Sequence, residues 1–128
     1  MELLDAEFGP MSFDVIVREV VKHGPDAVLL GHSGSTSAQP IINDITTLIK
    51  AKMPGIIVII GGVFPTYHWQ QILEENAQID HVVCGEGEEV ALQLIQALQD
   101  GSALDTIKGI ATRKEGRPYR TPPAPTLQ

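Results

Sequence analysis

The feature that most constrains the fold is an unbroken apolar run, Ile-Ile-Val-Ile-Ile at residues 56–60, which ends in the pair Gly61-Gly62. Its β-branched residues favour a strand, and the lack of polar alternation indicates that both faces of that strand are buried. A strand covered on both faces is typical of a parallel sheet with helices on its two sides.

Strand-like and helical patterns alternate about four times along the chain. Apolar residues recur at helical spacing in residues 11–23, 40–53, 66–76 and 88–101. Strands are expected at residues 2–8, 26–33, 55–62 and 79–84, with a last strand or hairpin within 104–116. This alternation predicts a three-layer α/β/α sandwich around a mostly parallel sheet.

Length, charge and cysteine content restrict the class of protein. A chain of 128 residues suits one domain, and its net charge of −7 argues against a nucleic-acid-binding surface. No apolar run is long enough for a membrane span, and the acidic start is unlike a signal peptide. The single cysteine, Cys84, excludes an internal disulfide and a cysteine-built metal or iron–sulfur site, and it follows an apolar strand pattern that favours burial. We therefore expect a cytoplasmic protein.

The last part of the chain differs in composition from the rest. We place the α/β domain at residues 1–116 and interpret the proline-rich residues 117–128 as a linker. Three cations, Lys114, Arg117 and Arg120, lie near this boundary. We interpret the segment that carries them as a solvated tail.

Three polar or glycine-rich segments follow the expected strands, at residues 31–40, 61–68 and 85–89. Parallel α/β sheets bind ligands beyond the carboxyl ends of their strands, so we expect these segments to line one rim of the sheet. The rim lacks a Walker lysine and the third spaced glycine of a dinucleotide fingerprint. The rim is therefore a candidate binding site that is neither a Walker-type phosphate loop nor a dinucleotide-binding motif.

Each rim segment also has a purely structural interpretation. The pair Gly61-Gly62 serves equally well for a tight turn, and the hydroxyl groups of residues 33–37 serve as helix caps. Two histidines in separate segments, His32 and His68, are better explained by surface positions or hydrogen bonds than by a metal site. We predict no metal-binding residues in this chain.

Taken in order, three segments of the sequence resemble a known family. They are PDAVLLGHSGSTS, MPGIIVIIGGVFPTYHW and IDHVVCGEGEE. Together they resemble the cobalamin-binding domain of cobalamin-dependent radical S-adenosylmethionine (radical SAM) proteins. The resemblance covers residues 3–116 and is greatest to the anaerobic magnesium-protoporphyrin IX monomethyl ester cyclases.

The resemblance implies a flavodoxin-like, Rossmann-like fold that binds cobalamin (vitamin B12) across the rim, with its nucleotide tail in a slot between two strand-end loops. The residues implied for cofactor binding are His32, Ser33, Gly34, Ser35, Thr36, Gly61, Gly62, Val63, Phe64, Gly85, Glu86 and Gly87. The Asp-x-His-x-x-Gly motif of other cobalamin proteins is absent. The lower cobalt ligand therefore stays open between His32, an aromatic residue of the rim and water.

The resemblance also implies a longer parent protein. In the family, a radical SAM domain follows the cobalamin domain and uses S-adenosylmethionine and a 4Fe-4S cluster bound by three cysteines, which this chain lacks. The family's first strand and helix have no counterpart before residue 3, so we expect a truncated domain. The isolated chain is then without catalytic activity, and the parent acts in bacteriochlorophyll synthesis.

Two other classes of function compete with this interpretation. A receiver-like signalling or interaction module shares the topology but requires an acidic pair and a strand-end lysine that the sequence does not supply. An enzyme for a small phosphorylated ligand would use the rim segments, but no nucleophile is paired with a base in the sequence.

Overall fold

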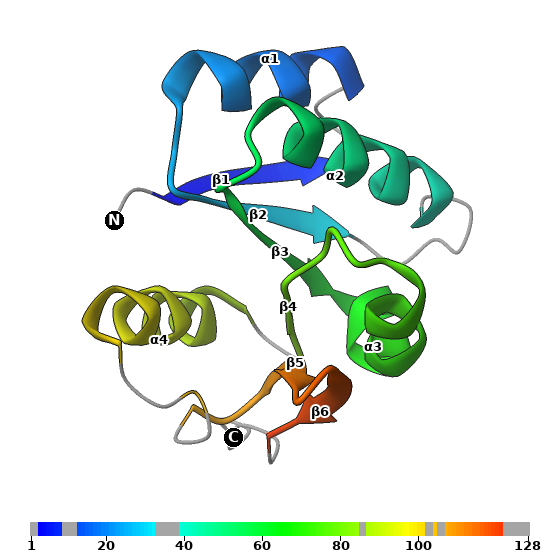
Figure 1. Cartoon of the computed structure of the whole chain (residues 1–128), viewed down its shortest axis with the longest axis vertical. Coiled ribbons are helices and arrows are strands. Elements are labelled where there is room, and N and C mark those ends of the chain that lie inside the picture. Colours follow the sequence, from blue (N-terminus) through cyan, green and yellow to red (C-terminus); the bar gives the residue numbers. More distant parts are fainter. Residues whose placement is uncertain are drawn as a thin grey trace.

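The computed structural model describes residues 3–8, 13–32, 39–84, 87–101, 104 and 107–121. Six strands and four helices form one sheet with a helical layer on each face (Figure 1). The strands are β1 (Leu3–Phe8), β2 (Ala27–His32), β3 (Ile57–Gly62), β4 (His81–Val83), β5 (Ile110–Lys114) and β6 (Arg117–Arg120). The helices are α1 (Phe13–His23), α2 (Gln39–Lys52), α3 (Val63–Glu75) and α4 (Gly87–Asp100).

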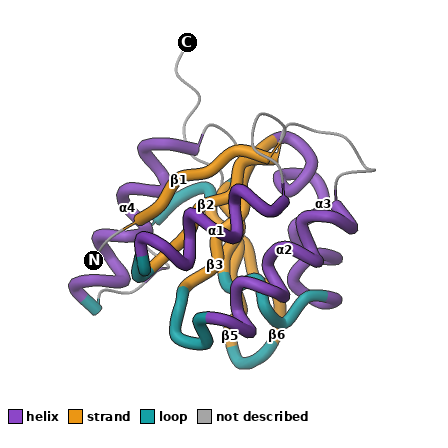
Figure 2. Tube along the Cα trace, turned by 90° about the horizontal axis from the view of Figure 1, so that it is seen from above, coloured by secondary structure: helices purple, strands orange, loops and turns teal. Residues whose placement is uncertain are grey.

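The sheet follows the order of the chain, β1-β2-β3-β4-β5-β6. Strands β1 to β4 are parallel, whereas β5 and β6 are antiparallel to their neighbours. When parallel strands are added in one direction, right-handed crossovers place every connecting helix on the same face. Helices α1, α2 and α3 do share one face, and α4 covers the other, so α3 and α4 lie on opposite sides of the strands in Figure 2.

Two hydrophobic cores fill the space between the layers, one on each face of the sheet. The core under α1, α2 and α3 includes Ile16, Val28, Leu30, Ile45, Ile60 and Ile72. The core under α4 includes Ala27, Leu29, Ile59, Val83, Leu94 and Ile110. Alternate residues of β3 enter opposite cores, which explains why its sequence has no polar position. The expected three-layer, flavodoxin-like class is confirmed.

Several helix ends follow from local sequence. The α1 helix stops at Gly24, whose positive φ of 56° lets its N–H reach the carbonyl of Val20 at 3.0 Å. Gly101 ends α4 with a φ of 72°, as the sequence predicts. None of the helices in the described part of the chain is long and apolar enough to cross a membrane.

Two details differ from the expectations. No loop separates β3 from α3, because the helix begins at Val63 directly after Gly62, so the segment expected as a rim loop is largely helical. Residues 117–120, which were assigned to a linker and a solvated tail, form strand β6. The signal was present but short, because four residues after a turn do not fix a strand until they pair with β5. The expected linker residues 122–128 lie outside the described residues.

Candidate functional site

The carboxyl ends of β2, β3 and β4 lie side by side, as the rim prediction requires. Gly31 of β2 pairs with Gly61 of β3, and His32 pairs with Gly62. Gly61 is in turn the register partner of Val83, the last residue of β4. The glycine pair and the end of β2 are therefore immediate neighbours, although 28 or more residues separate them in sequence.

Two of these glycines leave bare backbone on the same face of the sheet. Leu29 and Ile59 belong to the core under α4, and side chains two positions apart in a strand point to the same face. Gly31 and Gly61 therefore occupy neighbouring positions on the α4 face, each without a side chain. Gly61 is buried and Gly31 is half-buried. The result is a strip of backbone at the rim where two side chains would otherwise stand.

The surroundings of Gly61 show what this strip can accept. A Cβ atom added there would lie 3.5 Å from Val83 Cβ, 3.6 Å from Val83 O and 3.8 Å from Leu29 Cδ1. These are ordinary van der Waals contacts, and no positive φ is involved, so the fold does not demand glycine at this position. The space is bounded by apolar side chains with backbone polar groups between them. That lining fits a flat, largely apolar ligand group.

The structure describes half of the residues implied for cofactor binding. His32 ends β2, Gly61 and Gly62 end β3, Val63 and Phe64 begin α3, and Gly87 begins α4. All six therefore stand at or next to the carboxyl end of the sheet. The remaining six, Ser33, Gly34, Ser35, Thr36, Gly85 and Glu86, lie outside the described residues.

The aromatic residues after the glycine pair have separate roles. Tyr67 is 79% exposed, whereas Trp69 is half-buried and packs against the core under α1, α2 and α3. The guanidinium of Arg120, in β6, lies over the Trp69 ring at 5.9 Å from the ring centre. Sequence reasoning missed this arginine, because its segment was interpreted as a solvated tail and nothing local connects it to α3.

Cys84 follows β4 on the α3 face of the sheet. Its side chain belongs to the core there, which confirms the expected strand-end packing position, and its N–H donates to the carbonyl of Gly109 at 2.7 Å. Burial raises the pKa of the thiol, and the nearby positive charge of Arg120 opposes this only in part. The thiol is therefore held in its protonated, weakly reactive form.

No three side chains among the described His, Cys, Asp and Glu residues are grouped so that they would hold a metal ion. His68 lies on the exposed surface of α3, and His32 ends β2. The candidate site within the described residues is therefore built from backbone and apolar groups rather than from charged ligands.

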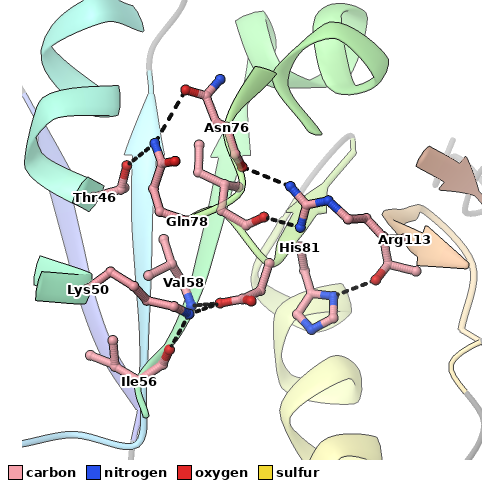
Figure 3. Close-up of polar contacts among 11 residues, drawn as sticks. Thr46, Lys50, Ile56, Val58, Asn76, Gln78, His81 and Arg113 are labelled. Carbon is pink, nitrogen blue, oxygen red and sulfur yellow. Dashed lines mark hydrogen bonds and ion pairs between the residues drawn. The ribbon is translucent and has the colours of Figure 1, made fainter. Parts of the chain in front are cut away.

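The polar contacts that hold the strands lie at the opposite end of β3 and β4 (Figure 3). Lys50 Nζ contacts Asp80 Oδ2 at 2.6 Å and donates to the carbonyl of Ile56 at 2.7 Å. The same Asp80 oxygen accepts the N–H of Val58 at 2.8 Å. These bonds connect α2 to the starts of β3 and β4. The side-chain hydrogen bonds therefore lie at one end of these strands, and the glycines of the candidate site lie at the other.

A second set of contacts joins β5 to the end of α3. Arg113 donates to three backbone carbonyls, those of Leu73, Asn76 and Ile79, at 2.7 to 2.8 Å. Helix C-termini carry unpaired carbonyls and partial negative charge, so a half-buried guanidinium is well matched to this position. Sequence patterns gave no signal for the contact, because 34 to 40 residues separate the partners.

Comparison with known proteins adds a family. Residues 1–95 match the family model described as B12 binding domain. The chain is 47% identical over 126 residues to the anaerobic magnesium-protoporphyrin IX monomethyl ester cyclase of Synechocystis sp., covering 98% of this chain and 25% of that protein. It is 30% identical over 132 residues to the cyclase of the same name from Rubrivivax gelatinosus, covering 98% and 23%. The chain thus spans about a quarter of each relative's length.

Solved structures share the fold. The structure of OxsB, a cobalamin-dependent S-adenosylmethionine radical enzyme with aqua-cobalamin and S-adenosylmethionine bound, aligns with a TM-score of 0.76. The alignment covers 90% of this chain and 16% of that one, at 21% identity. At that identity the likeness concerns the arrangement of strands and helices.

Proposed function

The chain belongs to the B12-binding domain family, and we propose that it binds cobalamin across the carboxyl ends of β2, β3 and β4. The observation that carries this proposal is the pairing of Gly31 with Gly61 on the α4 face. The nucleotide tail of the cofactor is a flat ring system. We place it along this strip, where it fills the space left by the absent side chains and contacts Leu29 and Val83.

Other residues of the rim complete the proposed site. They are His32, Ser33, Gly34, Ser35, Thr36, Gly62, Val63, Phe64, Gly85, Glu86 and Gly87. The hydroxyl-bearing residues after β2 would donate hydrogen bonds to the cofactor, and the start of α3 would cover one side of it. His32, a rim aromatic residue and water stay open as the lower cobalt ligand.

Bound cobalamin supplies cobalt-centred one-carbon or redox chemistry, and the chain's part is to hold and orient it. The apolar positions Leu29 and Val83 exclude water from one side of the tail. The sheet gives the rim a rigid base, because three strand ends are fixed in register by backbone hydrogen bonds. A rigid, preformed site binds with little ordering cost.

We further propose that the chain is part of a longer radical SAM enzyme in the cytoplasm. The similarity to the cyclases supports anaerobic magnesium-protoporphyrin IX monomethyl ester cyclase activity, in bacteriochlorophyll synthesis, for that longer protein. A radical SAM domain would supply S-adenosylmethionine and a 4Fe-4S cluster. The net charge of −7 argues against nucleic acid as a binding partner.

The test is a titration of the purified chain with hydroxocobalamin, followed by dialysis and a visible spectrum. Retention of about one cobalamin per chain with a shifted spectrum is the expected result. Loss of all cobalamin on dialysis would contradict the proposal for this chain. A receiver-like module or an enzyme for a phosphorylated ligand would likewise retain no visible chromophore.

Substitutions at Gly61 locate the site. Gly61→Ala would place a methyl group in the strip, and we expect it to weaken retention while the chain still folds, because the added Cβ makes only ordinary contacts. Gly55→Ala is the matched control, since a Cβ there meets nothing within 4 Å. Equal retention by Gly61→Ala and the control would show that the tail does not lie along β3.

A further inference from the structure

The helix that begins at the rim is divided in two. Within α3, His68 has φ −125° and ψ 18°, which breaks the regular helix between Val63–His68 and Trp69–Glu75. The first part follows β3 without a loop and contains Val63 and Phe64, two residues of the proposed site. The direction of the first part relative to the second is therefore set by the backbone at the junction, His68 and Trp69.

The second part of α3 is held at both ends by the hairpin of β5 and β6. Arg113 donates to the carbonyls of Leu73 and Asn76 at 2.8 Å, which fixes the end of the helix. Arg120 lies over Trp69, the first residue after the break, at 5.9 Å. Both arginines stand on the α3 face of the hairpin, since Arg120 is the register partner of Ala111, which packs in that core.

The two contacts differ in how much stability depends on them. Arg113 is half-buried and donates to three carbonyls, so its removal deletes three hydrogen bonds. Arg120 is exposed and contacts an aromatic ring, an interaction that few other groups depend on. The described residues show no carboxylate within ion-pair distance of Arg120. Its contact with Trp69 can therefore be removed with little effect on the fold.

We propose that the hairpin positions the start of α3 at the rim, and that Arg120 is a positioning residue for the ligand-binding site. The hairpin lies outside residues 1–95, which match the family model. Arg120 fixes Trp69 immediately beyond the break, and so limits the angles open to Val63–His68. This inference rests on the proposed function only where it concerns ligand affinity.

Hydrogen exchange of the ligand-free chain tests the positioning directly. In Arg120→Ala we expect the amides of residues 67–71 to exchange about two- to fivefold faster, the factor that corresponds to loss of one exposed cation–π contact. Peptides from β2 and β3 should exchange as in the wild type. Arg120→Lys keeps a cation over the ring and should restore much of the protection.

The matched control is Arg117→Ala, an exposed arginine of the same hairpin whose register partner is Lys114. It changes the net charge by the same amount and should leave exchange at residues 67–71 unchanged. Equal exchange in Arg120→Ala and wild type, or equal acceleration in Arg117→Ala, would overturn the proposal.

Affinity for hydroxocobalamin tests the link to the site. We expect Arg120→Ala to weaken binding about two- to fivefold, with a smaller loss in Arg120→Lys and none in Arg117→Ala. Faster exchange with unchanged affinity would overturn the link between the hairpin and the ligand. Failure of the wild type to retain cobalamin would instead count against the proposed function, while the exchange result would still decide the positioning.

Discussion

His81, at the start of β4, is held neutral by its surroundings. Burial lowers the pKa of its imidazole; the Asp80 carboxylate opposes that shift, while Arg113 and Lys50 add to it. The ring accepts or donates a hydrogen bond with Thr112 Oγ1 at 2.9 Å (Figure 3). A neutral ring suits this bond. The residue is therefore a structural histidine of the sheet, away from the candidate site.

This pKa shift predicts how stability depends on pH. The folded chain binds the His81 proton less tightly than an unfolded chain, whose histidine pKa is about 6.5. The contribution of neutral His81 to the free energy of unfolding is therefore complete above that pH. It is lost as the pH falls below that value toward the lowered pKa of the folded state. Urea unfolding at pH 7.5 and 5.5 should show a larger loss of free energy in the wild type than in His81→Asn.

The asparagine variant is chosen because its amide can keep the bond to Thr112 without titrating. Exposed His23 and His68 are unchanged in both proteins, so they cancel in the comparison. An equal loss of stability in the two proteins would mean that His81 does not carry the effect.

At the scale of elements, α2 is tied to the sheet by one carboxylate. Asp80 Oδ2 accepts from both Lys50 and the backbone of Val58, while Asp80 N–H donates to the Val58 carbonyl at 2.9 Å. Gln78 extends the link to Thr46 on α2 at 3.2 Å. These bonds fix the starts of two neighbouring strands, and through the strands they fix where the strand ends meet at the rim.

Removal of this carboxylate should be costly. We expect Asp80→Ala to lower the free energy of unfolding by about 1–3 kcal/mol, because the Val58 N–H loses its partner and Lys50 loses its counter-charge. Asp80→Asn should cost less, since an amide oxygen can still accept from Val58. Chemical denaturation of the three proteins measures the difference. Equal stability of the alanine and asparagine variants would show that the backbone bond contributes nothing.

At the scale of the whole molecule, two cores share one sheet. Ile45 of α2 and Leu94 of α4 are both fully buried, on opposite faces. Neither helical layer has a second sheet to pack on, so loss of either exposes the same strands. We therefore expect the described part of the chain to unfold in one cooperative step.

Core truncations test this cooperativity. Ile45→Ala and Leu94→Ala should each lower the free energy of unfolding by about 2–5 kcal/mol. Trp69 is the single tryptophan of the sequence and lies on the Ile45 face. In both variants its fluorescence and the far-UV circular dichroism should report the same midpoint. Separate midpoints in Leu94→Ala would mean that α4 unfolds on its own.

How well the sequence predicted each feature of the site depended on how far apart in the sequence the interacting residues are. The glycine-rich strand ends and the apolar helix faces can be recognised from patterns of neighbouring residues. The structure places His32, Gly61 and Gly62 at one rim, as expected. The position of α3 directly after β3 and the strand pairing of residues 117–120 were not expected.

The sequence by itself determined the approximate positions of β1 to β5 and of the four helices, that the sheet is mostly parallel and buried on both faces, and that glycine-rich segments follow its strand ends. These properties follow from periodicity and composition within a few residues. Only the tertiary structure decided that Gly31 stands beside Gly61, that Arg113 closes α3 and that Arg120 lies over Trp69. Such contacts join residues 30 to 51 positions apart, and they exist only after strand order and register are set.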